Sequence, residues 1–160
     1  MNANTLLELA VSLVPPARVI LDLGTQVLEL QNEEVAARWL SSVNDSEVSA
    51  AIFFDSGGEL CVLSRNGIKE SLNMSPFAKQ IGQCLVYLDE TYTRCTDLRV
   101  PTSYRAVVTL RPGLMKDRIV QAFDSLQADA ESWTGMICRN VWFLGRTSQD
   151  SRAYQQFSGR

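Results

Sequence analysis

The densest group of chemically active side chains in this sequence lies in nine consecutive residues, 89–97. The stretch supplies three carboxylates, one guanidinium group and several hydroxyls, from Asp89, Glu90, Thr91, Tyr92, Thr93, Arg94, Thr96 and Asp97. Adjacent carboxylates can hold a divalent cation, or act as acid and base where burial separates their pKa values. The alternative interpretation is a solvated polar loop in which Arg94 pairs with Asp97.

Other residues that could do chemistry are sparse. The chain has no histidine, the side chain best suited to proton transfer near neutral pH, so catalysis would need carboxylates, Cys, Tyr, Lys or Arg. The cysteines form no CxxC pair, and we therefore expect no metal site. Cys61 and Cys84 lie in apolar runs, which indicates buried thiols, and in the cytoplasm we expect them to be reduced.

Apolar runs and helical patterns alternate along the chain, and these elements must position the cluster. Strands are predicted at residues 19–23, 50–54, 59–63, 84–88, 105–110 and 136–144. Asn66-Gly67 predicts an antiparallel hairpin after the third of them. Helices are predicted at residues 5–14, after an N-cap at Asn32, after an N-cap at Ser75, and at residues 114–130. The buried face of the second helix is predicted to be Val35, Ala36, Trp39 and Leu40.

Strands that alternate with helices predict an α/β fold with a mainly parallel sheet sandwiched by helices. We expect a three-layer, RecA-like or Rossmann-like arrangement with a β-hairpin excursion. A single domain is predicted over residues 1–145, and a polar, flexible tail over residues 146–160. Ligands of parallel sheets bind beyond the carboxyl ends of the strands, which points to residues 89–97 as the site.

Composition and charge restrict the class of protein. The 160 residues are 46% hydrophobic and 21% charged, which is typical of a globular domain that buries about two-thirds of its unfolded surface. The net charge of −3 gives no overall attraction to a phosphate backbone, so nucleic acid is not an expected partner. No run reaches the roughly 20 apolar residues of a membrane span. We expect a cytoplasmic protein without membrane association.

Three runs of the sequence, LVYLDETYTRCTDLRVP, YRAVVTL and LMKDRIVQA, resemble the C-terminal helicase-like segment of very large fungal ubiquitin-related proteins of uncharacterised function. The resemblance extends from about residue 18 to residue 122. Residues 93–97 look like the Arg-Gly-x-Asp turn with which superfamily 2 helicases sense nucleotide, and residues 116–121 like the approach to their arginine fingers. The resemblance implies ligand contacts from Tyr92, Thr93, Arg94, Thr96, Lys116, Arg118 and Gln121.

The departures from this helicase pattern remove the parts that handle phosphate. Cys95 stands where the pattern has a turn glycine, and Tyr92 where a histidine is usual. Paired arginines do not follow Gln121, so the charge that stabilises a transferring phosphate is absent. No GxxxxGK[ST] motif occurs either. We therefore expect neither ATPase nor helicase activity.

A retained scaffold with missing catalytic parts favours a non-catalytic, degenerate domain that binds a protein or a nucleotide-like ligand, without a cofactor. The alternative is a small repurposed biosynthetic enzyme, of cyclisation or isomerisation type, with Asp89, Glu90 and Asp97 as proton carriers. In that hypothesis Arg94 or Arg118 steadies an anionic group. A third hypothesis is a truncated gene product with a helicase-like remnant. We expect the partner to be a small molecule, a protein or a second copy of the chain.

Overall fold

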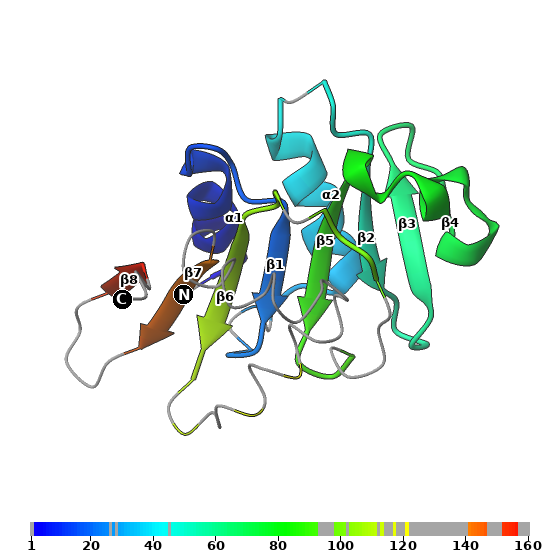
Figure 1. Ribbon diagram of the computed structural model, residues 1–160. Coiled ribbons are helices and arrows are strands. Elements are labelled where there is room, and N and C mark those ends of the chain that lie inside the picture. The colour runs from blue at the N-terminus through cyan, green and yellow to red at the C-terminus, as the bar shows by residue number, and fades with distance from the viewer. Residues whose placement is uncertain are drawn as a thin grey trace.

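Eight strands of the described chain form one sheet, in the spatial order β4-β3-β2-β5-β1-β6-β7-β8 (Figure 1). They are β1 (Val19–Asp22), β2 (Ala50–Phe54), β3 (Leu60–Ser64), β4 (Lys69–Ser71), β5 (Cys84–Asp89), β6 (Ala106–Leu110), β7 (Val141–Arg146) and β8 (Arg152–Gln156). Strands β2, β5, β1, β6 and β7 run parallel, whereas β3, β4 and β8 run antiparallel to a neighbour. The prediction of a mainly parallel α/β fold is confirmed.

This computed structural model describes most of the chain up to the end of β6 and parts of the remainder. The described residues are 2–25, 27, 29–44, 46–92, 98–101, 103–111, 113, 117, 121, 141–146 and 152–156. For β7 and β8 the description covers the backbone. The helix predicted at residues 114–130 lies outside the described residues except at positions 117 and 121, which are helical.

Strand β1 lies in the middle of the parallel part, between β5 and β6. Its register places Asp22 beside Asp89 on one side and beside Thr109 on the other. All four residues of β1 are buried, because strands and packed layers surround it. This explains why the strand reads as a continuous apolar run rather than an alternating one. Asp22, Asp89 and Thr109 lie at the carboxyl ends of three adjacent strands, and we call this end of the sheet the carboxyl edge.

Two helices, α1 (Ala3–Ser12) and α2 (Asn32–Ser42), cover the same face of the sheet (Figure 1). The N-cap of α1 is Asn2, whose side chain accepts a hydrogen bond from the backbone N of Thr5 at 2.9 Å. The helix ends before Pro15 and Pro16, which cannot continue it. Helix α2 buries Val35, Ala36, Trp39 and Leu40, which confirms the predicted face.

The start of α2 differs from the prediction in one respect. The N-cap is Gln31, whose backbone N donates to Glu34 Oε2 at 2.9 Å, and Asn32 is the first helical residue. An N-cap side chain is occupied by backbone amides of its own helix. Because Asn32 does not have this role, its side chain reaches the sheet instead.

The opposite face of the sheet packs against short 3-10 helices and against Leu98, Val100 and Tyr104. The 3-10 helices are η1 (Leu72–Met74), η2 (Pro76–Lys79) and η3 (Ile81–Gln83). The side chain of Ser75 accepts from Phe77 N, so the helix start predicted at Ser75 is confirmed, with 3-10 geometry. The Tyr104 hydroxyl donates to the carbonyls of Ile81 and Cys84, which ties Tyr104 to the start of β5.

The predicted hairpin forms between β3 and β4, and β4 is an edge strand of the sheet. Gly67 has a φ of 79°, the conformation that an Asn-Gly turn requires. The neighbouring Arg65 donates to three backbone carbonyls at the far end of α2 and beyond it, those of Leu40, Val43 and Val48. Carbonyls at a helix end lack hydrogen-bond donors within the helix, and the Arg65 guanidinium group supplies such donors.

The last two strands extend the sheet past β6. Strand β7 overlaps the last four residues of the strand predicted at residues 136–144 and runs two residues beyond it. Strand β8 lies in the segment predicted to be a flexible tail, and it pairs antiparallel with β7. None of the described helices is both long enough and apolar enough to cross a membrane.

Candidate functional site

The carboxyl edge brings together polar side chains from three neighbouring strands. Asp22, Asp89 and Thr109 are partners in the parallel ladders, so their side chains point to the same face of the sheet. This is the face that α1 and α2 cover, because Ile20, two residues before Asp22, packs there. Polar groups on adjacent parallel strands thus converge where ligands of such sheets bind.

Asp22 is the more enclosed of the two carboxylates, with an exposed fraction of 2%. One carboxylate oxygen accepts a hydrogen bond from the Thr109 hydroxyl. The other accepts from the backbone N of Val27 at 3.1 Å and from the Tyr87 hydroxyl at 3.4 Å. The Thr109 hydroxyl in turn accepts from Gly24 N at 3.0 Å. A buried carboxylate needs such donors, and here they hold the turn after β1 against the sheet.

Tyr87 contributes to this network as a neutral donor. Burial raises the pKa of Tyr87 well above its ordinary value of 10, and the nearby charges of Asp22 and Asp89 raise it further. A phenol that stays protonated can donate to Asp22 over the whole physiological range. Tyr87 therefore helps to hold Asp22 in place.

Asp89 is half-buried and lies at the more open side of the network. One carboxylate oxygen accepts from Asn32 Nδ2 at 3.0 Å, and the other accepts from the backbone N of Tyr92 at 3.2 Å. Asn32 Nδ2 also donates to the carbonyl of Phe54 at 2.9 Å. The first residue of α2 therefore joins the ends of β2 and β5. A carboxylate has about four acceptor positions, so Asp89 keeps capacity for a ligand donor.

Tyr92, predicted to contact ligand, packs against the end of β2. Its ring stacks on Phe54 with the ring centroids 4.9 Å apart and the planes 19° apart. A Cβ placed on Gly58 would lie 3.2 Å from Tyr92 Cε1, so the glycine leaves room for the ring. Gly58 also has a φ of 79°, which disfavours other residues. This contact fixes the chain as it leaves β5.

Glu90 faces a different partner from Asp89. Its Oε1 lies 2.9 Å from Arg111 Nη2, and the Glu90 side chain has an exposed fraction of 14%. Arg111 directly follows β6, so this ion pair joins the chain after β5 to the chain after β6. Two of the predicted acid–base residues, Asp89 and Glu90, thus bond to separate elements.

Most of the other predicted site residues lie outside the residues that the structure describes. Gln121 is described, as an exposed helical residue. The positions that lie outside the described residues are Thr93, Arg94, Thr96, Asp97, Lys116 and Arg118. The structure therefore relates Asp89, Glu90 and Tyr92 to their surroundings, and the roles of the other residues stay predictions.

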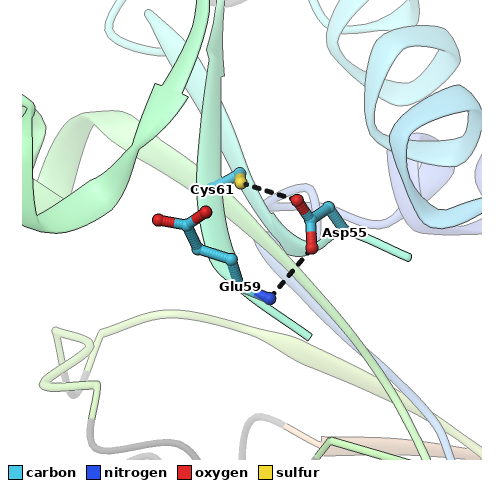
Figure 2. Close-up of side chains that lie close together, drawn as sticks. All are labelled: Asp55, Glu59 and Cys61. Atoms are coloured by element: carbon cyan, nitrogen blue, oxygen red, sulfur yellow. Dashed lines mark hydrogen bonds between the residues drawn. The ribbon is translucent and has the colours of Figure 1, made fainter. Parts of the chain in front are cut away.

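A second polar group, which the sequence analysis did not single out, lies at the turn between β2 and β3. Asp55, Glu59 and Cys61 each place a potential metal ligand atom within 4.8 Å of the others (Figure 2). Asp55 Oδ1 accepts from the backbone N of Gly57 and of Glu59, both at 2.9 Å. The Cys61 thiol lies 3.7 Å from Asp55 Oδ2. These bonds brace the turn.

The thiol of this group is poorly prepared to bind a metal. Burial, aided by the charge of Asp55, raises the pKa of Cys61 to about 11. Metals bind the thiolate, so a cation would have to displace a strongly held proton. Cys84 is also a buried thiol, and burial raises its pKa to about 12. The predicted burial of both cysteines is confirmed.

Asp55 gives a testable pH dependence. The hydrogen bond from the Glu59 backbone is the main cause that holds the pKa of Asp55 below its usual value of 3.8. A lowered pKa in the folded state stabilises the protein above the unfolded value, and this stabilisation is lost as the pH falls through the folded value. Asp55→Asn keeps an acceptor but cannot titrate. We expect the difference in melting temperature between wild type and Asp55→Asn to shrink as the pH falls from 6 to 2.

Asp55→Ala is the control for the loss of the hydrogen-bond acceptor. Its side chain has no acceptor, so we expect it to have a lower melting temperature than Asp55→Asn at every pH. Thermal unfolding followed by circular dichroism measures all three proteins. A wild-type advantage over Asp55→Asn that persists undiminished at pH 2 would contradict the assigned role of the Asp55 charge.

Sequence reasoning missed four members of the site: Asp22, Asn32, Tyr87 and Thr109. Asp22 carried a usable signal, because it ends a continuous apolar strand just as Asp89 does. Asn32 was identified, but as a cap. Tyr87 and Thr109 lie inside apolar runs, and only the strand order brings them beside Asp22.

Comparison of the chain with protein-family models, with curated proteins and with solved structures finds no match. The assignment of the site therefore depends on its geometry. The resemblance to helicase-like segments stays a prediction.

Proposed function

We propose that this chain acts by binding: it is a non-catalytic, degenerate relative of the helicase-like segment that holds a nucleotide-like ligand at the carboxyl edge. The observation that carries the proposal is the register of Asp22 and Asp89 in the middle of the sheet. The connection from β1 leads to β2 on one side, and the connection from β6, which neighbours β1, leads to β7 on the other. Ligands of open parallel sheets bind where such connections diverge.

The contacts suggest a division of labour between the two carboxylates. Asp22 is buried and accepts from Thr109, Val27 and Tyr87, so it supports the site. Asp89 is half-buried and accepts from Asn32 and Tyr92 through one oxygen each. We assign the ligand contact to Asp89, as an acceptor for a hydroxyl or amino group.

The described contacts favour binding over acid–base catalysis. A general acid and a general base must face one reacting group. Asp89 bonds to the start of α2, whereas Glu90 forms an ion pair with Arg111. Their separate partners support a site that orients a ligand without the proton transfers of the alternative enzyme hypothesis.

We also propose the RecA-like three-layer arrangement, on an argument of handedness. A right-handed crossover from β1 to β2 accounts for α2 on one face of the sheet. The connection from β6 to β7 moves in the opposite direction along the sheet. The same handedness places a crossover helix there on the opposite face. The helix predicted at residues 114–130 would supply this third layer.

The binding test uses adenosine, AMP and Mg²⁺–ATP as probes, with backbone amide NMR spectra and calorimetric titration. We expect shifts at residues 22–25 and 89–92, and at least a tenfold weaker affinity in Asp89→Asn, because an amide replaces one acceptor oxygen with a donor. Glu47→Gln is the matched control. Glu47 is exposed and pairs with Arg18, which precedes β1 at the opposite end of that strand.

Two results would reject the proposal. One is that no probe perturbs the carboxyl edge. The other is that Asp89→Asn binds as tightly as wild type. Conversion of a probe by the purified chain, lost in Asp89→Asn, would support the enzyme hypothesis in its place.

A further inference from the structure

The turn that follows β1 contains a residue in an unfavourable backbone conformation. Thr25 has a φ of 46° and is the only non-glycine residue with positive φ among the described residues. The left-handed region is disfavoured for side chains in general and most of all for β-branched ones. Such a conformation persists only where the surroundings hold it.

The groups that hold this turn are buried and come from the sheet. Gly24 N donates to Thr109 Oγ1 at 3.0 Å, just before Thr25. Val27 N donates to Asp22 Oδ2 at 3.1 Å, just after it. Asp22 and Thr109 are themselves hydrogen-bonded and have exposed fractions of 2% and 0%. We call this buried pair the latch.

If the turn detached from the latch, Asp22 and Thr109 would still have hydrogen-bond partners. If Gly24 and Val27 moved away, Asp22 would still accept from the hydroxyls of Thr109 and Tyr87. No buried charge would lose all its partners, which is the usual obstacle to local opening. The backbone hydrogen bonds that Gly24 and Val27 donate to the latch would be exchanged for bonds to water, and the strain at Thr25 would be relieved. These opposing terms are of similar size, so the two arrangements lie close in free energy.

The turn is connected to the ligand-contacting residue. The chain that starts at this turn reaches α2, whose first residue, Asn32, donates to Asp89. Before α2, Glu29 Oε1 accepts from Ala3 N at 2.6 Å, at the start of α1. A shift of the turn therefore acts on the position of Asn32 and on the bond that it gives to Asp89.

We propose that the turn at residues 23–25 is a two-state element that regulates the carboxyl edge. In the latched state described here, Thr25 is left-handed and Asn32 is bonded to Asp89. In the released state, Thr25 returns to negative φ, the bonds of Gly24 and Val27 to the latch break, and Asn32 leaves Asp89. The regulatory meaning depends on the proposed binding function, because a ligand at Asp89 selects between the two states.

Amide hydrogen exchange of the ligand-free full chain tests the two states, with Thr25→Asn and Thr25→Val. Asparagine tolerates the left-handed region, whereas valine keeps the shape and the strain of threonine. We expect exchange at Gly24 and Val27 in wild type to occur through a local opening that denaturant does not accelerate. Thr25→Asn should slow it about fivefold, and Thr25→Val should leave it unchanged. Exchange of the Asn32 side-chain amide should likewise slow in Thr25→Asn and stay unchanged in Thr25→Val.

The proposal is overturned if the asparagine and valine variants exchange alike, or if both amides exchange only through global unfolding. It is also overturned if Gly24 and Val27 slow in Thr25→Asn while the Asn32 side chain does not. Because the measurement needs no ligand, its result is separate from the nucleotide titration. A failed titration with slowed exchange would reject the binding function and keep the two-state turn.

Discussion

Asp22→Ala is expected to lower the free energy of unfolding by about 3 kcal/mol, the largest effect on stability among the substitutions considered. The substitution removes the acceptor of the Thr109 hydroxyl, the Val27 amide and the Tyr87 hydroxyl at a site with 2% exposure. The hydroxyls of Thr109 and Tyr87, left without this acceptor in the interior, cost free energy that solvent cannot return. Urea unfolding measures the loss as a lower midpoint at an unchanged slope.

Asp22→Asn is the matched variant, because it keeps the shape and one acceptor oxygen. We expect a loss of about half that of alanine, since its NH₂ group faces donors rather than acceptors. An alanine variant within 0.5 kcal/mol of wild type, the range expected for surface positions, would mean that Asp22 does not hold the turn after β1.

Arg65→Ala is expected to lower the free energy of unfolding by about 2 kcal/mol. Its guanidinium group donates to the carbonyls of Leu40, Val43 and Val48, with distances of 3.0, 2.8 and 2.7 Å. Arg65 lies on the β3–β4 hairpin, so these bonds attach the hairpin to the end of α2 and to the chain before β2. Loss of the side chain leaves the helix end without these donors.

Arg65→Lys separates the charge from the geometry. An ammonium group cannot reproduce the planar fork that serves three carbonyls at once, so we expect lysine to recover less than half of the loss. Lys79→Ala, an exposed basic residue on η2, should change the free energy of unfolding by less than about 0.5 kcal/mol. Full recovery in Arg65→Lys would show that charge alone matters at this position.

Several elements were predictable because their signals are local. The apolar runs of β1, β2 and β5, the buried face of α2 and the Asn66-Gly67 turn depend on the order of residues within a few positions. A strand buried on both faces must be apolar throughout, and a helix that covers a sheet must repeat its apolar residues at helical spacing. These constraints are present in the chain before any tertiary contact forms.

The site was predictable only in part, because its partners are distant in sequence. Asp89 was identified from its place at the end of an apolar strand. Asp22 accepts from Thr109 and Tyr87, which lie 87 and 65 positions away. Asn32 reaches Asp89 across 57 positions. No local pattern relates residues at such separations.

The sequence by itself determined the places of the central strands β1, β2, β5 and β6 and of the helices α1 and α2, and it placed acidic residues where β1 and β5 end. It did not indicate β8. The tertiary structure alone decided the strand order, which puts β1 between β5 and β6 and so sets Asp22 beside Asp89 and Thr109. The physical reason is that periodicity specifies which face of an element is buried, whereas the neighbour of each strand depends on how all the apolar faces pack together.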